Sequence, residues 1–248
     1  MGYWVSRQIG WQRLITPVSR GGIWNRYTVL ASLCNLVRSV LYFWGFVLLP
    51  VGHAILLLYT WPIIVAALST LVLKEPFRPW QLVMGFLALI GIGIIQFSPE
   101  TLSPHQLWVG STVVLGVAAS NAAMLLALQR NPDTLTPPET IFVQNFAGAV
   151  FFLPTGLTLI TTIPVSRTVA SIAMSIVVGI GGYAFFYSAL KKIPTSQAAI
   201  FSYIEVFFTI MIATIFLDEP LTAAKLMGGA LILTGSIGAQ RFQAKRST

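Results

Sequence analysis

Two ionisable side chains stand in the middle of long apolar stretches. Arg38 lies within residues 28–49 and Glu205 within residues 195–217. A charged side chain at membrane depth costs about 2.5–3.5 kcal/mol on insertion scales, so each such residue needs a partner or a function. We interpret both as lining a water-accessible cavity, where they would bind the charged ends of a solute and where Glu205 would take up a proton. The alternative is a buried ion pair, or capping of backbone freed near Pro62, that fixes helix packing.

Aromatic and amide side chains extend this set of candidates. Tyr42 follows Arg38 by one helical turn, and with Trp61 it could form aromatic walls around an apolar or cationic solute. Ordinary packing explains each of these aromatics equally well. Hydrogen bonding between helices is the alternative for Asn121, and packing of the neighbouring glycines is the alternative at Tyr183. The candidate binding residues are Arg38, Tyr42, Trp61, Asn121, Tyr183 and Glu205.

The elements that would position these residues are membrane-spanning helices. Hydrophobic residues make up 56% of the 248-residue chain and charged residues only 9%, whereas a soluble domain carries roughly 25% charged residues. A spanning helix needs about 20 mainly apolar residues. The sequence predicts an all-α polytopic bundle of about eight spans, at 28–49, 54–73, 80–97, 106–129, 139–160, 169–190, 195–217 and 225–240. The connections between them are short and rich in proline and charge, which is typical of turns.

The net charge of +8 follows the rule that cytoplasmic loops carry the basic residues. With the N-terminal segment inside, twelve of the fifteen Lys and Arg residues lie on the inner side. Both termini are therefore predicted to be cytoplasmic, and nucleic acid is not an expected partner. A single cysteine, Cys34, excludes an internal disulfide. His53 and His105 lie far apart without nearby acids, so we expect neither a metal nor another cofactor.

The chain contains an internal repeat at an offset of 144 residues. Residues 50–96 align without gaps on residues 194–240 with 13 identities in 47 positions, including Tyr59 on Tyr203 and Glu75-Pro76 on Glu219-Pro220. The matched turns follow spans that run in opposite directions, so the halves are inverted, as in many secondary transporters. We predict an incomplete first repeat over residues 1–98, a complete second repeat over 104–241 and a tail over 242–248. Two helices of the first repeat are expected to be absent, and residues 1–22 to form an interfacial helix or the end of a lost span.

These features resemble the EamA-type transporters of the drug/metabolite transporter superfamily. The resemblance is carried by Tyr203-Ile204-Glu205-Val206, by Leu217-Asp218-Glu219-Pro220 and by the glycine-rich helix beginning at Gly228, and the first half repeats it with Trp61-Pro62 and Leu73-Lys74-Glu75-Pro76. The resemblance implies ten helices in two inverted five-helix repeats, cytoplasmic termini, a central substrate cavity and, often, export of metabolites, amino acids or drugs. This chain differs by lacking the first two helices, by Asp218 where glycine is usual and by Val206 where proline is usual.

We therefore expect a secondary transporter, an exporter of a small metabolite, amino acid or drug-like solute, that works by alternating access through a cavity between the repeats. The expected partners are the solute, protons and the lipid bilayer of the cell membrane, which is the inner membrane in a bacterium; a homodimer is a further option. One alternative is a truncated membrane protein that does not transport or that assists an assembly. An integral membrane enzyme is the other, but the sequence lacks the Gly-x-Ser-x-Gly and His-Glu-x-x-His motifs, so we expect no enzymatic activity.

Overall fold

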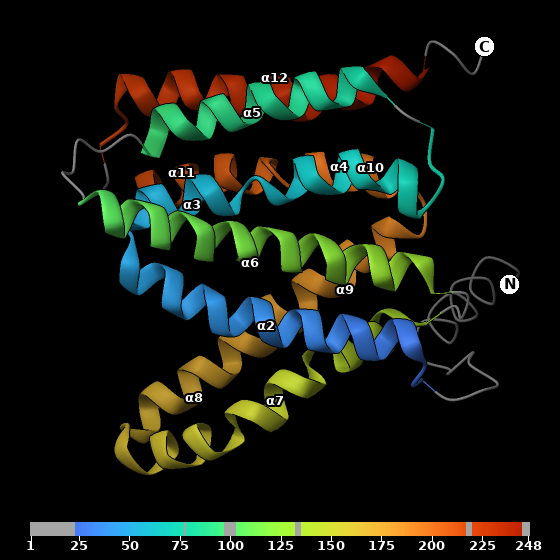
Figure 1. The fold of residues 1–248 in the computed structure, drawn as a ribbon. Helices are drawn as coiled ribbons and strands as arrows, with labels where there is room; N and C mark the ends of the chain where they lie inside the picture. Colours follow the sequence, from blue (N-terminus) through green and yellow to red (C-terminus); the bar gives the residue numbers. More distant parts are fainter. Residues whose placement is uncertain (1–22, 77, 97–102, 132–134, 217–219, 245–248) are drawn as a thin grey trace, which may run out of the picture. The chain divides into compact units, whose positions relative to one another are not determined.

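The computed structural model describes residues 23–76, 78–96, 103–131, 135–216 and 220–244, and these residues contain helices but no strands (Figure 1). They belong to two compact units, the first formed within Met1–Leu36 and Ala127–Lys192, the second within Val37–Leu126 and Ile193–Thr248. Each unit takes segments from both predicted repeats. The repeat boundaries therefore stay a prediction, and the residues 1–22 on which an interfacial helix was expected lie outside the described residues.

The helices follow the predicted spans closely. Their bounds are α2 Arg26–Leu48, α3 Val51–Leu58, α4 Trp61–Val72, α5 Pro79–Gln96, α6 Pro104–Arg130, α7 Pro137–Thr162, α8 Val165–Met174, the π-helix η1 Ser175–Gly182, α9 Tyr183–Leu190, α10 Thr195–Phe201, α11 Ile204–Phe216 and α12 Ala223–Ala244. Within the described part of the chain, seven segments are long and apolar enough to cross a membrane: α2, α3–α4, α5, α6, α7, α8–η1–α9 and α10–α11. The eighth, α12, contributes a shorter apolar stretch over Ala223–Ala239. The predicted polytopic helical fold is thus confirmed.

Prolines in the connections set where several helices begin. Pro79, Pro104 and Pro137 are the first residues of α5, α6 and α7, a position that needs no backbone N–H and favours the fixed φ of proline. At α7 the preceding Thr136 and Glu139 form a capping box, in which each side chain accepts a hydrogen bond from the other residue's backbone N–H. The prolines in the turns between the predicted spans therefore also begin the helices that follow.

The first unit is held together by one aromatic contact and several hydrogen bonds along α7. The ring of Trp24 packs edge-on against Phe146, with centroids 5.0 Å apart. The Ser32 hydroxyl accepts a hydrogen bond of 3.0 Å from the backbone N–H of Ala147, and the Asn35 amide donates one of 2.8 Å to the carbonyl of Gln144. Tyr187 of α9 donates a hydrogen bond to the buried Gln144 side chain. Polar groups that lipid cannot satisfy are thus paired between helices.

The second unit contains two helices that are interrupted at matching positions. The helix over residues 51–72 is broken by turn residues 59–60, which separate α3 from α4, and the helix over 195–216 by residues 202–203, which separate α10 from α11. The next helices, α5 and α12, begin at Pro79 and Ala223. All these boundaries agree with the 144-residue offset to within one residue, so the aligned sequences also share their local structure.

Helices α5 and α12 cross antiparallel through small residues (Figure 1). A Cβ atom on Gly91 would lie 2.6 Å from the carbonyl oxygen of Gly228, and one on Gly235 would lie 2.5 Å from that of Met84. The repeat superposes Gly91 on Gly235 and Met84 on Gly228, so each contact is the counterpart of the other. Such an exchange of partners is the signature of twofold symmetry, here an approximate one.

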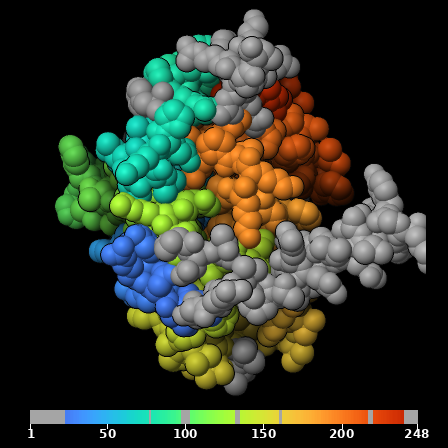
Figure 2. Space-filling model, turned by 90° about the vertical axis from the view of Figure 1, so that its right-hand side faces the viewer, coloured from blue at the N-terminus to red at the C-terminus, as the bar shows by residue number. Residues whose placement is uncertain are grey.

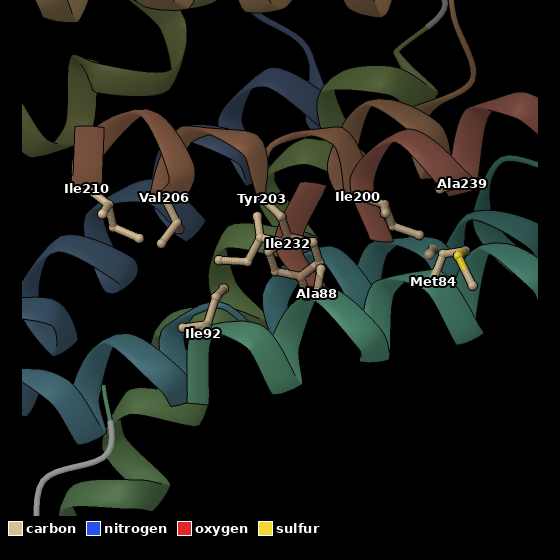
Figure 3. Packing of buried hydrophobic residues seen from close by; sticks show 10 residues of the cluster. Met84, Ala88, Ile92, Ile200, Tyr203, Val206, Ile210, Ile232 and Ala239 are labelled. Atoms are coloured by element: carbon tan, nitrogen blue, oxygen red, sulfur yellow. The ribbon is translucent and has the colours of Figure 1, made fainter. Parts of the chain in front are cut away.

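A row of buried side chains fills the space beside this crossing (Figure 3). It runs from Met84 and Ala239 at one end, through Ala88, Ile232 and Tyr203, to Ile210 at the other. Tyr203, Ala88 and Ile232 are each 0% exposed. Ala88 and Ile232 are repeat equivalents, so the approximate twofold axis passes close to this central group. The interruptions in α3–α4 and α10–α11 are thereby fixed to a tightly packed core.

Candidate functional site

Two equivalent tyrosines meet at the helix interruptions. The Tyr203 hydroxyl donates a hydrogen bond of 2.7 Å to the backbone carbonyl of Tyr59, across a sequence separation of 144 residues. The two rings lie 6.0 Å apart between centroids. Residues that are equivalent by the repeat and also contact each other must lie at the twofold axis that relates the repeats. The two interruptions are therefore neighbours at the approximate axis of the second unit.

Proline explains why the Tyr59 carbonyl needs a partner from another helix. Pro62 has no backbone N–H, and the N–H of Ile63 is already bonded to the carbonyl of Thr60 at 3.1 Å. The carbonyl of Tyr59 consequently has no donor within its own turn, and the Tyr203 hydroxyl takes that place. Burying such a carbonyl without a donor would cost about 1–3 kcal/mol.

The second repeat lacks this need. Val206 stands where the first repeat has Pro62, and its backbone N–H donates to the carbonyl of Tyr203 at 3.1 Å. The Tyr59 hydroxyl is therefore not required at the position that symmetry would give it. It donates instead to Oε1 of Glu205, at 2.5 Å, a length typical of a charge-assisted O–H···O⁻ bond.

Glu205 lies at the start of a helix and is an exposed residue. Glu205 is the second residue of α11, in its first turn, where the helix dipole and free backbone N–H groups favour negative charge. It also lies near the middle of the 22-residue membrane-spanning segment Thr195–Phe216. The residue as a whole is exposed at the surface of the second unit. Because lipid does not tolerate an ionised carboxylate, this exposure favours contact with a water-filled space.

Three of the predicted residues belong to the same unit as Glu205. Trp61 is the first residue of α4 and directly follows the interruption, where its side chain is half-buried. Tyr42 lies in α2, and its ring packs 4.5 Å from that of Phe46. Arg38 is half-buried, one turn before Tyr42 in α2.

The other two candidates are placed differently. Asn121 is half-buried in α6, within the second unit. Tyr183 belongs to the first unit, as the first residue of α9, and its ring stacks on Tyr187 at 6.0 Å. The structure thus groups Glu205 with residues around the interruptions and gives Tyr183 an aromatic packing partner. Roles of all six in binding remain proposals.

Sequence reasoning did not select Tyr59 and Tyr203 as site residues. Both were visible as an identical pair in the repeat alignment, one just before Pro62 and the other just before Glu205. A polar residue that is repeated beside a proline or a mid-span charge is the signal that could have identified them. What the alignment lacked was the knowledge that the equivalent positions contact each other.

A second carboxyl, Glu75, joins the repeats at the end of α4. Its Oε1 accepts a hydrogen bond of 2.7 Å from the N–H of Thr195, and its Oε2 accepts bonds from the N–H (3.2 Å) and hydroxyl (2.7 Å) of Ser196. Pro194 provides no side-chain cap for α10, so Glu75 caps this helix from the turn before α5. Figure 2 views this end, with the α4–α5 region in teal against the orange segment around α10.

The hydrogen bonds to Glu75 change its acidity. Partial burial alone would raise the pKa of the carboxyl, but the bonds from Ser196 and Thr195 outweigh burial and hold the pKa below its ordinary value. Glu75 lies in a turn outside the membrane-spanning segments. Its repeat equivalent, Glu219, lies outside the described residues. The described residues contain no group of three or more His, Cys, Asp or Glu side chains that could hold a metal ion.

Comparison with known proteins identifies the family. The model of the EamA-like transporter family matches residues 9–97 and 108–239. The chain is 26% identical over 205 residues to the threonine/homoserine exporter RhtA of Escherichia coli K12, covering 80% of this chain and 65% of that protein. It is 25% identical over 222 residues to protein PecM of Dickeya dadantii, covering 88% of this chain and 73% of that protein.

Two further similarities agree with this match. The uncharacterized transporter YvbV of Bacillus subtilis is 25% identical over 215 residues, covering 85% of this chain and 70% of that protein. A solved crystal structure superposes with a TM-score of 0.70 at 20% identity, covering 87% of this chain and 76% of that one, which shows a shared fold. The chain spans slightly less than two thirds of the length of the RhtA exporters it matches. The family match extends over most of the sequence, and it confirms the resemblance seen in the residues: the chain belongs to the EamA-like transporter family.

Proposed function

We propose that this protein is a secondary transporter that exports a small solute across the cell membrane, with Glu205 in its binding site. The observation that carries the proposal is a glutamate in mid-span, exposed at the surface of the second unit, at an interruption where two repeat-related helices meet. Discontinuous helices near the bilayer midplane form the solute sites of many secondary transporters. The family membership agrees with transport as the activity.

The chemistry of the site favours a solute with a positively charged group. A carboxylate attracts an ammonium group or a proton, and the ring of Tyr59, whose hydroxyl contacts Glu205, offers a face for a cation. Trp61 is proposed to offer a second face. The relatives named as threonine/homoserine exporters handle molecules that carry such a group. We therefore propose an amino acid, or a metabolite or drug-like amine, as the solute, and Arg38 as a candidate for its opposite charge.

Alternating access is the mechanism that the repeat favours. Two similar, inverted halves allow two states of nearly equal energy that open to opposite sides, and the exchanged contacts of Gly91 and Gly235 follow such a symmetry. Tyr42 and Asn121 are proposed to line the solute cavity in the second unit, and Tyr183 is proposed as a binding residue of the first unit. Both termini are proposed to be cytoplasmic, with transport driven by proton exchange or by the solute gradient.

Transport by reconstituted protein tests the proposal. Proteoliposomes loaded with radiolabelled threonine, homoserine or a panel of small amines are compared for wild type, Glu205→Gln and Arg38→Ala. Glu139→Gln is the matched control, because glutamine preserves the capping box of α7. We expect Glu205→Gln to reduce efflux at least ten-fold and the control to leave it unchanged. Unchanged efflux in both site variants would refute the assigned site, and no efflux by folded wild type would favour a membrane protein that does not transport.

A further inference from the structure

We infer that Tyr59 is the positioning residue for Glu205, and that Val206 makes this role possible. The inference rests on the proposed function for its consequence in transport, but its structural part stands on the hydrogen bonds alone. A hydroxyl from the interruption of the first repeat holds the carboxyl of the second repeat across 146 residues of sequence. The repeat alignment pairs Tyr59 with Tyr203 and Glu205 with Trp61, and the Tyr203 hydroxyl bonds to a backbone carbonyl instead of to a side chain.

The approximate twofold symmetry defines two acceptors for the Tyr59 hydroxyl. The counterpart of the observed bond from Tyr203 to the Tyr59 carbonyl is a bond from Tyr59 to the Tyr203 carbonyl. That carbonyl already accepts the N–H of Val206. The second acceptor is the carboxyl of Glu205, which occupies the position of Trp61 in the first repeat. The bond observed is to the carboxyl, where charge makes a hydrogen bond stronger than at a neutral carbonyl.

The sequence therefore breaks the symmetry at two adjacent positions that act together. Valine in place of proline at 206 supplies the N–H that releases the Tyr59 hydroxyl, and glutamate in place of tryptophan at 205 supplies the new acceptor. With the hydroxyl in place, the carboxyl is fixed in one orientation at the start of α11. A bound ammonium group shares this carboxyl with Tyr59. Solute binding therefore also changes the hydrogen bond made by Tyr59, which stands at the α3–α4 interruption.

Chemical labelling of the carboxyl tests the positioning without knowledge of the solute. The purified full chain is treated at pH 7 with dicyclohexylcarbodiimide, and modification of Glu205 is followed by mass spectrometry in wild type, Tyr59→Phe and Tyr27→Phe, with Glu205→Gln as the blank. Tyr27→Phe is the matched control, because it removes the same hydroxyl in the first unit, where that hydroxyl accepts a hydrogen bond from the neighbouring Arg26. We expect Tyr59→Phe to label about ten-fold faster, the order of one lost hydrogen bond to a charged group, and Tyr27→Phe to label at the wild-type rate.

A backbone variant provides an independent arm. Proline is tolerated in the first turn of a helix, so Val206→Pro removes the N–H and frees the Tyr203 carbonyl as a competing acceptor. We expect its labelling rate to fall between those of wild type and Tyr59→Phe. Equal rates in wild type and Tyr59→Phe overturn the positioning by Tyr59, and a wild-type rate in Val206→Pro overturns the role given to Val206.

Efflux of radiolabelled threonine then separates this inference from the proposed function. If Tyr59 positions the carboxyl for solute, Tyr59→Phe raises the KM for efflux several-fold with a smaller change in kcat, whereas Tyr27→Phe leaves KM unchanged. Faster labelling of Tyr59→Phe without any efflux by wild type sustains the positioning and refutes threonine transport. Efflux that depends on Glu205 with identical KM and labelling for Tyr59→Phe sustains the proposed function and refutes the positioning.

Discussion

The crossing of α5 and α12 depends on the absence of a side chain at Gly91. A Cβ atom there would lie 2.6 Å from the carbonyl oxygen of Gly228, 3.0 Å from Cβ of Leu231 and 3.1 Å from Cγ1 of Ile232. The first of these atoms belongs to the backbone and cannot move aside without shifting α12. Gly91→Ala is therefore predicted to separate the two helices and destabilise the second unit.

The size of this effect follows from a comparison within the same helix. A Cβ atom on Gly93 would meet only Leu56, at 3.6 Å, an ordinary van der Waals contact. Both alanine substitutions gain the same helix propensity, about 1 kcal/mol, so this term cancels in their difference. Overpacking a close-packed site costs about 1–3 kcal/mol. Gly91→Ala should thus be less stable than Gly93→Ala by about 1–3 kcal/mol, which corresponds to a Tm difference of roughly 2–12 °C for a chain of this size.

Thermal stability in detergent measures this difference. Aliquots of each fluorescently tagged variant are heated, and the folded fraction is quantified by size-exclusion chromatography. Gly93→Ala is expected to match or exceed the wild-type Tm, and Gly91→Ala to fall below it. Equal Tm values for the two alanine variants would show that the helices do not meet through Gly91.

Three further changes test the turn at Glu75 and the polar contact of the first unit. Lys74 has a left-handed φ of 59°, a conformation that glycine adopts more easily than alanine. Lys74→Gly should therefore be more stable than Lys74→Ala by about 0.5–1 kcal/mol, measured as a higher Tm. Because the pKa of Glu75 is lowered in the folded state, its stabilising contribution is fully present above its ordinary pKa and is lost as the pH falls through the folded pKa. Glu75→Gln should therefore lower the Tm at pH 7, and the difference from wild type should shrink below about pH 4.5; a constant difference from pH 7 to pH 3 contradicts the cap. Tyr187→Phe leaves the buried Gln144 side chain without its donor and should cost about 1–3 kcal/mol, seen as a lower Tm while Tyr183→Phe retains that of wild type.

The sequence determined the helices because their signals are local. Apolar length alone placed the eight spans, and the structure moves their ends by only a few residues. The repeat offset followed from identities such as Tyr59 on Tyr203, and it also predicted that corresponding helices begin at corresponding positions. Mid-span charge singled out Glu205 in the same way, since an ionisable residue in an apolar run is visible without any knowledge of packing.

The partners of these residues were decided only by the tertiary structure. The two compact units mix segments of both repeats, which a linear alignment does not reveal. Glu205 bonds to Tyr59 rather than to another charge, because the donor that symmetry would use at Tyr203 is made unnecessary by the N–H of Val206. Likewise, Glu75 looked like part of a turn and proves to cap α10, 120 residues later. Hydrogen-bond partners depend on which donors and acceptors remain free once the helices have packed, and this property belongs to the folded chain and to no single segment.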